Sequence, residues 1–302
     1  MIFADGTTFQ MSSNYLTDLF SVANSELDKA SVWFKANKLT LNVSKTKFIL
    51  FRSKNMHVEF KNLKLNIGNE EILRIGSDCK EKFFKFVGIY LDEHLSWDHH
   101  INHVGNKVAS GNYAISNAKN FLPKKVRLTM YNSFFRSYCD YGILAWGGVK
   151  PSKLKKITKL QKKCVRNIAG RGHRTHTDPL FSTFNILKFD DLFKFNCSVF
   201  MHKYIYGKLP SSFCNFFNEF PPPNRTKSLI VDKFKNVFLN QFPSTFLPKL
   251  WNEIDVILKN TSSHNKFKDS LYFSFISKYP PSIKCFDKTC PDCYPPVIYL
   301  SR

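Results

Sequence analysis

Acidic residues are scarce in this sequence. Only 23 Asp and Glu stand against 45 Lys and Arg in 302 residues, which leaves a net charge of +22. Because such an excess opposes folding through self-repulsion, a polyanionic partner explains it better than a need for stability. Nucleic acid is the first candidate for this partner, and an anionic membrane surface is the second.

Long apolar runs are missing as well. No stretch approaches the roughly 20 uncharged apolar residues of a membrane-spanning helix, and no signal peptide opens the chain. We therefore expect an intracellular protein, in the nucleus or the cytoplasm, with no membrane span. The hydrophobic content of 43% still allows a folded protein with a real core.

The eight cysteines show no disulfide pattern. They are scattered along a chain without a secretory signal, so we expect reduced thiols. Cys285, Cys290 and Cys293 include one Cys-x-x-Cys pair, but three thiols fall one short of the four ligands of a structural zinc site. A disordered tail is therefore favoured over a zinc site at this end of the chain.

The first hundred residues predict one long helix and several short strands. Asp5-Gly6 lies between apolar residues, which indicates a tight hairpin turn, since glycine adopts positive φ without steric cost. Apolar residues recur at helical spacing from 16 to 34. A turn at 42–45 leads into an apolar run at 48–51, which is typical of a buried strand, and alternation around Gly68-Asn69 predicts a surface hairpin.

Helical patterns follow from residue 98 onwards. Helices are expected over 100–121, from Pro123 to about 138, and over 151–170, where Gly170 is a natural stop. The last of these has one apolar stripe, and its other positions are mostly basic. The stripe consists of Leu154, Ile157, Leu160, Cys164, Val165 and Ile168.

The positive charge is concentrated in this helical segment. Residues 98–172 contain 15 Lys or Arg and two Asp or Glu, a net +13 of the total +22. A helix surface with one sign of charge gives up the stabilisation that opposite pairs supply, so an external anion explains it best. Plain solubility is the alternative.

These motifs occur in an order that resembles the reverse transcriptases of jockey-type non-LTR retrotransposons, over nearly the whole chain. Phe3-Ala4-Asp5-Gly6-Thr7 is similar to the aromatic-Ala-Asp-Asp hairpin that holds catalytic metal in that family. Leu41-Asn42-Val43-Ser44-Lys45-Thr46-Lys47 is similar to its fourth palm motif, in which a lysine lies near the departing pyrophosphate. Phe86-Val87-Gly88-Ile89 is similar to its primer grip.

The resemblance implies an α+β fold with three regions. A small palm remnant of β-hairpins and a helix would span residues 1–97, with the grip-like hairpin at its end. A basic helical thumb would span 98–172, and a mainly helical C-terminal region would span 173–302.

The resemblance implies RNA-directed DNA polymerase chemistry with Mg²⁺, but the sequence supplies too few ligands. Two metals about 4 Å apart need several carboxylates to hold them. In the family one Asp comes from an earlier strand and two come from the hairpin, whereas here Gly6 replaces one and only four residues precede Asp5. Asp5 is then a vestigial ligand that binds Mg²⁺ weakly, and Lys45 keeps the place of the proton donor. Whether the chain is an enzyme stays open, although we expect it to be inactive alone.

The implied ligand is RNA or DNA in the form of a template-primer. Phe86 and Gly88 would contact it through the grip, and basic thumb residues would contact phosphates. These basic residues are Lys124, Lys125, Arg127, Lys155, Lys156, Lys159, Lys162, Lys163 and Arg166.

Three functions stay open. The first is an inactive, nucleic-acid-binding fragment of the polymerase. The second is an active reverse transcriptase, if a longer chain or a complementing polymerase supplies the missing palm and fingers. The third is a basic module that binds a protein or an anionic membrane.

Overall fold

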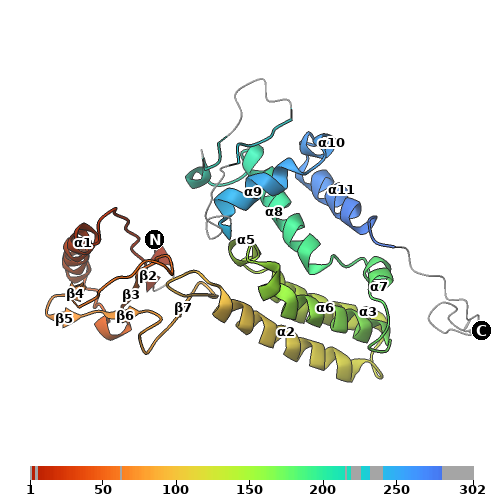
Figure 1. The fold of residues 1–302 in the computed structure, drawn as a ribbon, viewed down its shortest axis with the longest axis horizontal. Helices are drawn as coiled ribbons and strands as arrows, with labels where there is room; N and C mark the ends of the chain where they lie inside the picture. Colours follow the sequence, from red (N-terminus) through yellow and green to blue (C-terminus); the bar gives the residue numbers. More distant parts are fainter. Residues whose placement is uncertain are drawn as a thin grey trace, which may run out of the picture. The chain divides into compact units, whose positions relative to one another are not determined.

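The computed structural model describes residues 2–3, 6–61, 63–214, 216–218, 226–231 and 241–280, the first three of these residues by their backbone only. The fold is α+β with a mainly helical part, as the sequence predicted. It divides into two compact units, Met1–His100 and Ile101–Arg302 (Figure 1).

The first unit combines one long helix with small two-stranded sheets. The helix α1 (Leu16–Ala36) covers a core built from Phe20, Ala23 and apolar residues around the hairpin of β4 and β5. Asn24 ties the two together, because its amide donates to the carbonyl oxygen of Lys64 (3.0 Å) and accepts from the backbone N–H of Asn66 (3.0 Å). The other elements are β1 (Ile2–Phe3), β2 (Gly6–Thr7), η1 (Val43–Lys45), β3 (Lys47–Ile49), β4 (Asn66–Ile67), β5 (Glu70–Glu71), β6 (Leu73–Ile75), β7 (Phe84–Phe86) and β8 (Ile89–Leu91).

Pairing of the strands confirms one predicted hairpin and corrects two details. β4 and β5 pair antiparallel across Gly68-Asn69, as predicted, and Gly68 has a φ of 61°. β1 and β2 also pair, but Phe3 is opposite Gly6, so the prediction that Gly6 occupies the turn is wrong. The strand expected at 48–51 covers 47–49 and pairs parallel with β6, and its residues are exposed or half-buried instead of buried.

The second unit consists of helices. The predicted helices at 100–121 and 151–170 are confirmed, and the one from Pro123 to 138 continues to Asp140 with a π-helical turn in its middle. The elements are α2 (Asp98–Ala118, whose first three residues belong to the first unit), α3 (Lys124–Tyr131), η2 (Asn132–Arg136), α4 (Ser137–Asp140), α5 (Ile143–Trp146), α6 (Pro151–Ala169), α7 (Asp178–Thr183), α8 (Phe189–Ile205), η3 (Ser211–Phe213), α9 (Pro243–Asn252), α10 (Val256–Lys259) and α11 (His264–Ile276).

Helices from both sides of residue 172 pack together in this unit. α8 contacts α4, α5 and α6 on one side and α9 and α11 on the other (Figure 1). The regions 98–172 and 173–302 therefore share one core, in which Trp146 stacks on Phe189.

A buried amide joins three segments of this core. Gln161, on the apolar side of α6, is fully buried. Its Nε2 donates to the hydroxyl of Tyr131 (2.9 Å) and to the carbonyl oxygen of Leu187 (2.9 Å), and its Oε1 accepts from the backbone N–H of Phe189 (2.8 Å). Since buried polar groups cost free energy unless they are paired, this one side chain sets how α3, α6 and the start of α8 meet.

We predict that Gln161→Leu lowers the free energy of unfolding by about 2–4 kcal/mol, because it leaves Leu187 and Phe189 with unpaired buried backbone groups. Chemical unfolding followed by circular dichroism measures the change. Lys162→Leu puts the same side chain on the exposed side of α6 and is expected to change stability by less than about 0.5 kcal/mol. Equal effects of the two substitutions would contradict this role of the amide.

Candidate nucleic-acid interface

Helix α6 has one buried side and one exposed basic side. Leu154, Ile157, Cys164, Val165 and Ile168 are buried, as predicted, whereas Leu160 is only half-buried because Gln161 takes the central position. The exposed lysines are Lys155, Lys156, Lys159, Lys162 and Lys163, and we call them the α6 lysine row.

Acidic side chains neutralise little of the positive charge of the α6 lysine row. In the part of the chain that the structure describes, no carboxylate pairs with Lys155, Lys159, Lys162 or Lys163. Lys156 donates to Oδ1 of Asn106 on α2 (3.1 Å), which is a neutral acceptor. The positive charge of the row is therefore directed at solvent and at whatever binds there.

Two of the residues predicted to contact phosphates, Arg127 and Arg166, donate hydrogen bonds to backbone carbonyl oxygens of the protein. Arg127 is buried, and its Nη1 donates to the carbonyl oxygen of Asn167 (2.9 Å) in the last turn of α6, where helix carbonyls lack partners. Arg166 is half-buried, and its Nε donates to the carbonyl oxygen of Thr175 (2.7 Å). The burial of Arg127 contradicts the prediction that it contacts phosphates. Lys124 is half-buried and Lys125 is exposed.

Two basic loops meet at one end of these helices. Arg127 follows the loop 119–123 and reaches the last turn of α6, from which the loop 170–176 departs. Lys119, Arg171, His173 and Arg174 on these loops are exposed. These loop residues were not among the predicted contacts, although the run Gly170-Arg171-Gly172-His173-Arg174 directly after a basic helix indicates a basic loop.

In the first unit, the predicted primer grip is a hairpin with an unusual turn. β7 and β8 pair antiparallel from Phe86–Ile89 to Phe84–Leu91, and Phe86 is half-buried. The turn residues Val87 and Gly88 have φ values of 44° and 82°. Glycine tolerates this conformation, but a β-branched valine in it is strained, and such strain is often found at functional turns.

We predict that Val87→Asn raises the melting temperature of the first unit by a few degrees, which corresponds to about 1 kcal/mol, because Asn-Gly suits a turn with two positive φ values. Fluorescence of Trp33 and Trp97 reports unfolding of this unit. Val87→Thr keeps the β-branch and is expected to bring no gain. A melting temperature that falls in Val87→Asn would show that the valine side chain itself stabilises the hairpin.

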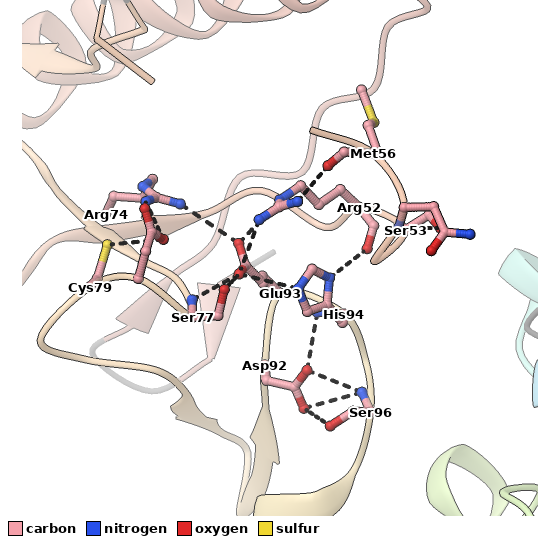
Figure 2. A network of polar contacts seen from close by, with 12 residues as sticks. Arg52, Ser53, Met56, Arg74, Ser77, Cys79, Asp92, Glu93, His94 and Ser96 are labelled. Atoms are coloured by element: carbon pink, nitrogen blue, oxygen red, sulfur yellow. Dashed lines mark hydrogen bonds and ion pairs between the residues drawn. The ribbon is translucent and has the colours of Figure 1, made fainter. Parts of the chain in front are cut away.

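A buried carboxylate fixes the end of this hairpin to the neighbouring strands. Figure 2 shows Glu93, the second residue after β8, between Arg52 and Arg74. Its carboxylate lies 3.3 Å from Nε of Arg52 and 3.6 Å from Nη1 of Arg74, and it accepts from the hydroxyl and from the backbone N–H (2.8 Å) of Ser77. The Glu93 side chain is 1% exposed, so these contacts replace its hydration.

The same loop is closed by a second carboxylate. Asp92 accepts from the backbone N–H groups of His94 (3.1 Å) and Ser96 (3.1 Å) and from the Ser96 hydroxyl (2.9 Å). Burial raises the pKa of Glu93, but the hydrogen bonds from Ser77 and the charge of Arg52 outweigh this effect and hold that pKa below its ordinary value. Both carboxylates therefore have structural roles, which hold the hairpin in place.

We predict that the first unit loses stability as the pH falls below about 4.3, the ordinary pKa of glutamate, because a carboxyl with a lowered folded-state pKa stabilises the fold only while it is charged. Glu93→Gln should flatten this acid dependence and cost about 3 kcal/mol at pH 7, since it removes the carboxylate partner of Arg52 and one of the two carboxylate partners of Arg74, which keeps Asp78. Unfolding is followed by Trp33 and Trp97 fluorescence between pH 3 and 7. Glu70→Gln, on an exposed strand, is the control and should keep the wild-type pH profile.

Among the described residues, the structure shows no metal site near the predicted catalytic residues. Lys45 is exposed at the end of η1, where its backbone N–H donates to Asn42 (3.1 Å). Asp5 and Cys285, Cys290 and Cys293 lie outside the described residues. Elsewhere in the described chain, no three His, Cys, Asp or Glu side chains come close enough to hold a metal ion.

None of the helices in the described ranges is both long enough and apolar enough to cross a membrane. Comparison of the chain with models of protein families, with curated proteins and with solved structures finds no match.

Proposed function

We propose that this chain is a nucleic-acid-binding fragment of an RNA-directed DNA polymerase of the non-LTR retrotransposon type. In this proposal it binds RNA or DNA through α6 and does not polymerise DNA by itself. The observation that carries the binding function is the α6 lysine row, which is exposed and lacks carboxylate partners in the described structure.

The spacing of the row supports contact with a phosphate backbone. α6 has 19 residues and is therefore about 28 Å long, at about 1.5 Å per residue. Its lysines recur at every turn, so they can follow several consecutive phosphates on one strand. Such contacts position a nucleic acid without reading its sequence.

The absence of independent catalysis is supported by the donor set around the first hairpin. Gly6 in β2 pairs with Phe3 in β1, and glycine has no side chain that could bind a metal. Asp18 and Asp28 are exposed on α1, whereas a two-metal centre needs several converging carboxylates. The residues present do not fit such a centre, so no catalytic step is assigned to the chain alone.

We predict that replacing Lys155, Lys159, Lys162 and Lys163 by Gln weakens binding to a labelled RNA or DNA strand at least ten-fold at 0.1 M salt. It should also reduce the slope of log K against log[salt] by about 2–3, since each lost phosphate contact removes close to one released counterion. Fluorescence anisotropy over a salt series measures both quantities.

The matched control replaces Lys35, Lys38, Lys54 and Lys61 by Gln. These lysines are exposed in the first unit, so the net charge changes equally while α6 is intact. Binding that falls equally in both variants would assign the affinity to net charge and contradict a site on α6. Primer extension by the wild-type chain with Mg²⁺, lost in Asp5→Ala, would contradict the lack of independent catalysis.

A further inference from the structure

Two aromatic rings project into solvent from one side of α2 and the loop after it. Tyr113 is 70% exposed and Phe121 is 84% exposed. Tyr113 follows Asn106 and Ser110 on one stripe of α2, since positions 106, 110, 113 and 117 are separated by three or four residues. Phe121 lies in the turn that follows the helix, where its backbone N–H donates to the carbonyl oxygen of Ala118 (3.1 Å).

This stripe borders the α6 lysine row. Asn106 accepts from Lys156 (3.1 Å), and farther along both helices Asn112 accepts from Asn167 (2.8 Å). The two contacts advance together, so α2 and α6 run side by side in the same direction (Figure 1). Tyr113 is about two turns after Asn106, as Lys163 is about two turns after Lys156. The helical repeat therefore places Tyr113 on the same side of α2 as Asn106, which Lys156 of the row contacts.

The stripe ends where the two basic loops meet. Phe121 belongs to the loop 119–123, which Arg127 connects to the end of α6 and to the loop 170–176. Lys119 and Lys125 lie within four residues of Phe121 in the chain, Arg171 and Arg174 lie on the loop 170–176, and all four are exposed. The exposed ring of Phe121 contributes little to the protein core.

We propose that Tyr113 and Phe121 stack on unpaired bases of a single-stranded RNA or DNA whose phosphates lie along the α6 lysine row and the two basic loops. This inference rests on the proposed function and adds a preference for single strands. Aromatic rings beside a cationic groove bind single strands because each unpaired base offers a face for stacking. In a duplex these faces are covered by neighbouring base pairs, so the rings gain nothing from it.

A lipid surface fits this stripe less well. Binding at a membrane interface needs a continuous apolar side that can enter the acyl boundary. Here Asn106, Ser110 and Asn117 lie on the same side of α2 as Tyr113, and all three are exposed. Amides and hydroxyls beside a ring suit contacts with bases and sugars.

The test compares a labelled 15-nucleotide RNA strand with the same strand in a duplex, for the wild-type chain and for the double variant Tyr113→Leu/Phe121→Leu. Binding of the single strand is expected to weaken roughly ten-fold or more. Duplex binding should change less than about two-fold, and the salt slope should stay at the wild-type value because no charge is removed. Both positions are exposed, so the melting temperature should not change.

Two controls isolate the effect of stacking. Tyr15→Leu/Phe273→Leu removes two rings of similar exposure, 70% and 72%, from other surfaces and should leave binding unchanged. Abasic sites in the RNA should weaken wild-type binding to the level of the Tyr113→Leu/Phe121→Leu variant.

The outcomes separate this inference from the function on which it rests. If the four-lysine variant loses binding and Tyr113→Leu/Phe121→Leu keeps it, stacking is refuted and the proposed function stands. If the four-lysine variant binds as tightly as wild type, the proposed function fails as well. Binding to vesicles of phosphatidylcholine and phosphatidylserine that depends on the two rings, with unchanged RNA binding, would assign the stripe to a membrane.

Discussion

The second unit depends on the way α6 is held by its buried side. Gln161 satisfies three polar groups from different segments, and the apolar residues before and after it fill the core. Because these contacts fix the rotation of α6 about its axis, the lysines on its opposite side have no alternative to solvent. The candidate interface is thus a direct consequence of core packing. A rotated α6 would bury charge at a cost that the core could not offset.

Several of the few acidic residues pair with cations away from α6. Glu93 serves Arg52 and Arg74 in the first unit, and Asp178 pairs with Lys188 in the second. Asp140, one of only two acids between 98 and 172, pairs with Arg136 and accepts from Asn196. Acidic residues are therefore scarcest in residues 98–172. Most of the lysines and arginines there lie on α6 and on the loops at its end.

Local sequence patterns predicted the helices well and the strands partly. The spacing of apolar residues predicted α1, α2 and α6 nearly to their ends. Gly68-Asn69 predicted the hairpin of β4 and β5. The register of the first hairpin was wrong by one residue, since a turn of two residues can precede Gly6 as well as contain it. Arg127 was predicted to contact phosphates, but it is buried, because it lies four residues before the buried Tyr131 on the same side of the helix.

The sequence by itself determined the sign of the charge, its concentration between 98 and 172, and the two sides of α6, because composition and helical period are local properties. Only the tertiary structure decided that Arg127 is buried, that Glu93 lies between Arg52 and Arg74 after the grip-like hairpin, and that Asn106 of α2 meets Lys156 of the lysine row. Each of these depends on contacts between residues far apart in the chain, such as Arg127 with Asn167 or Arg52 with Glu93. Such contacts follow from how buried surfaces fit together, which no local period encodes.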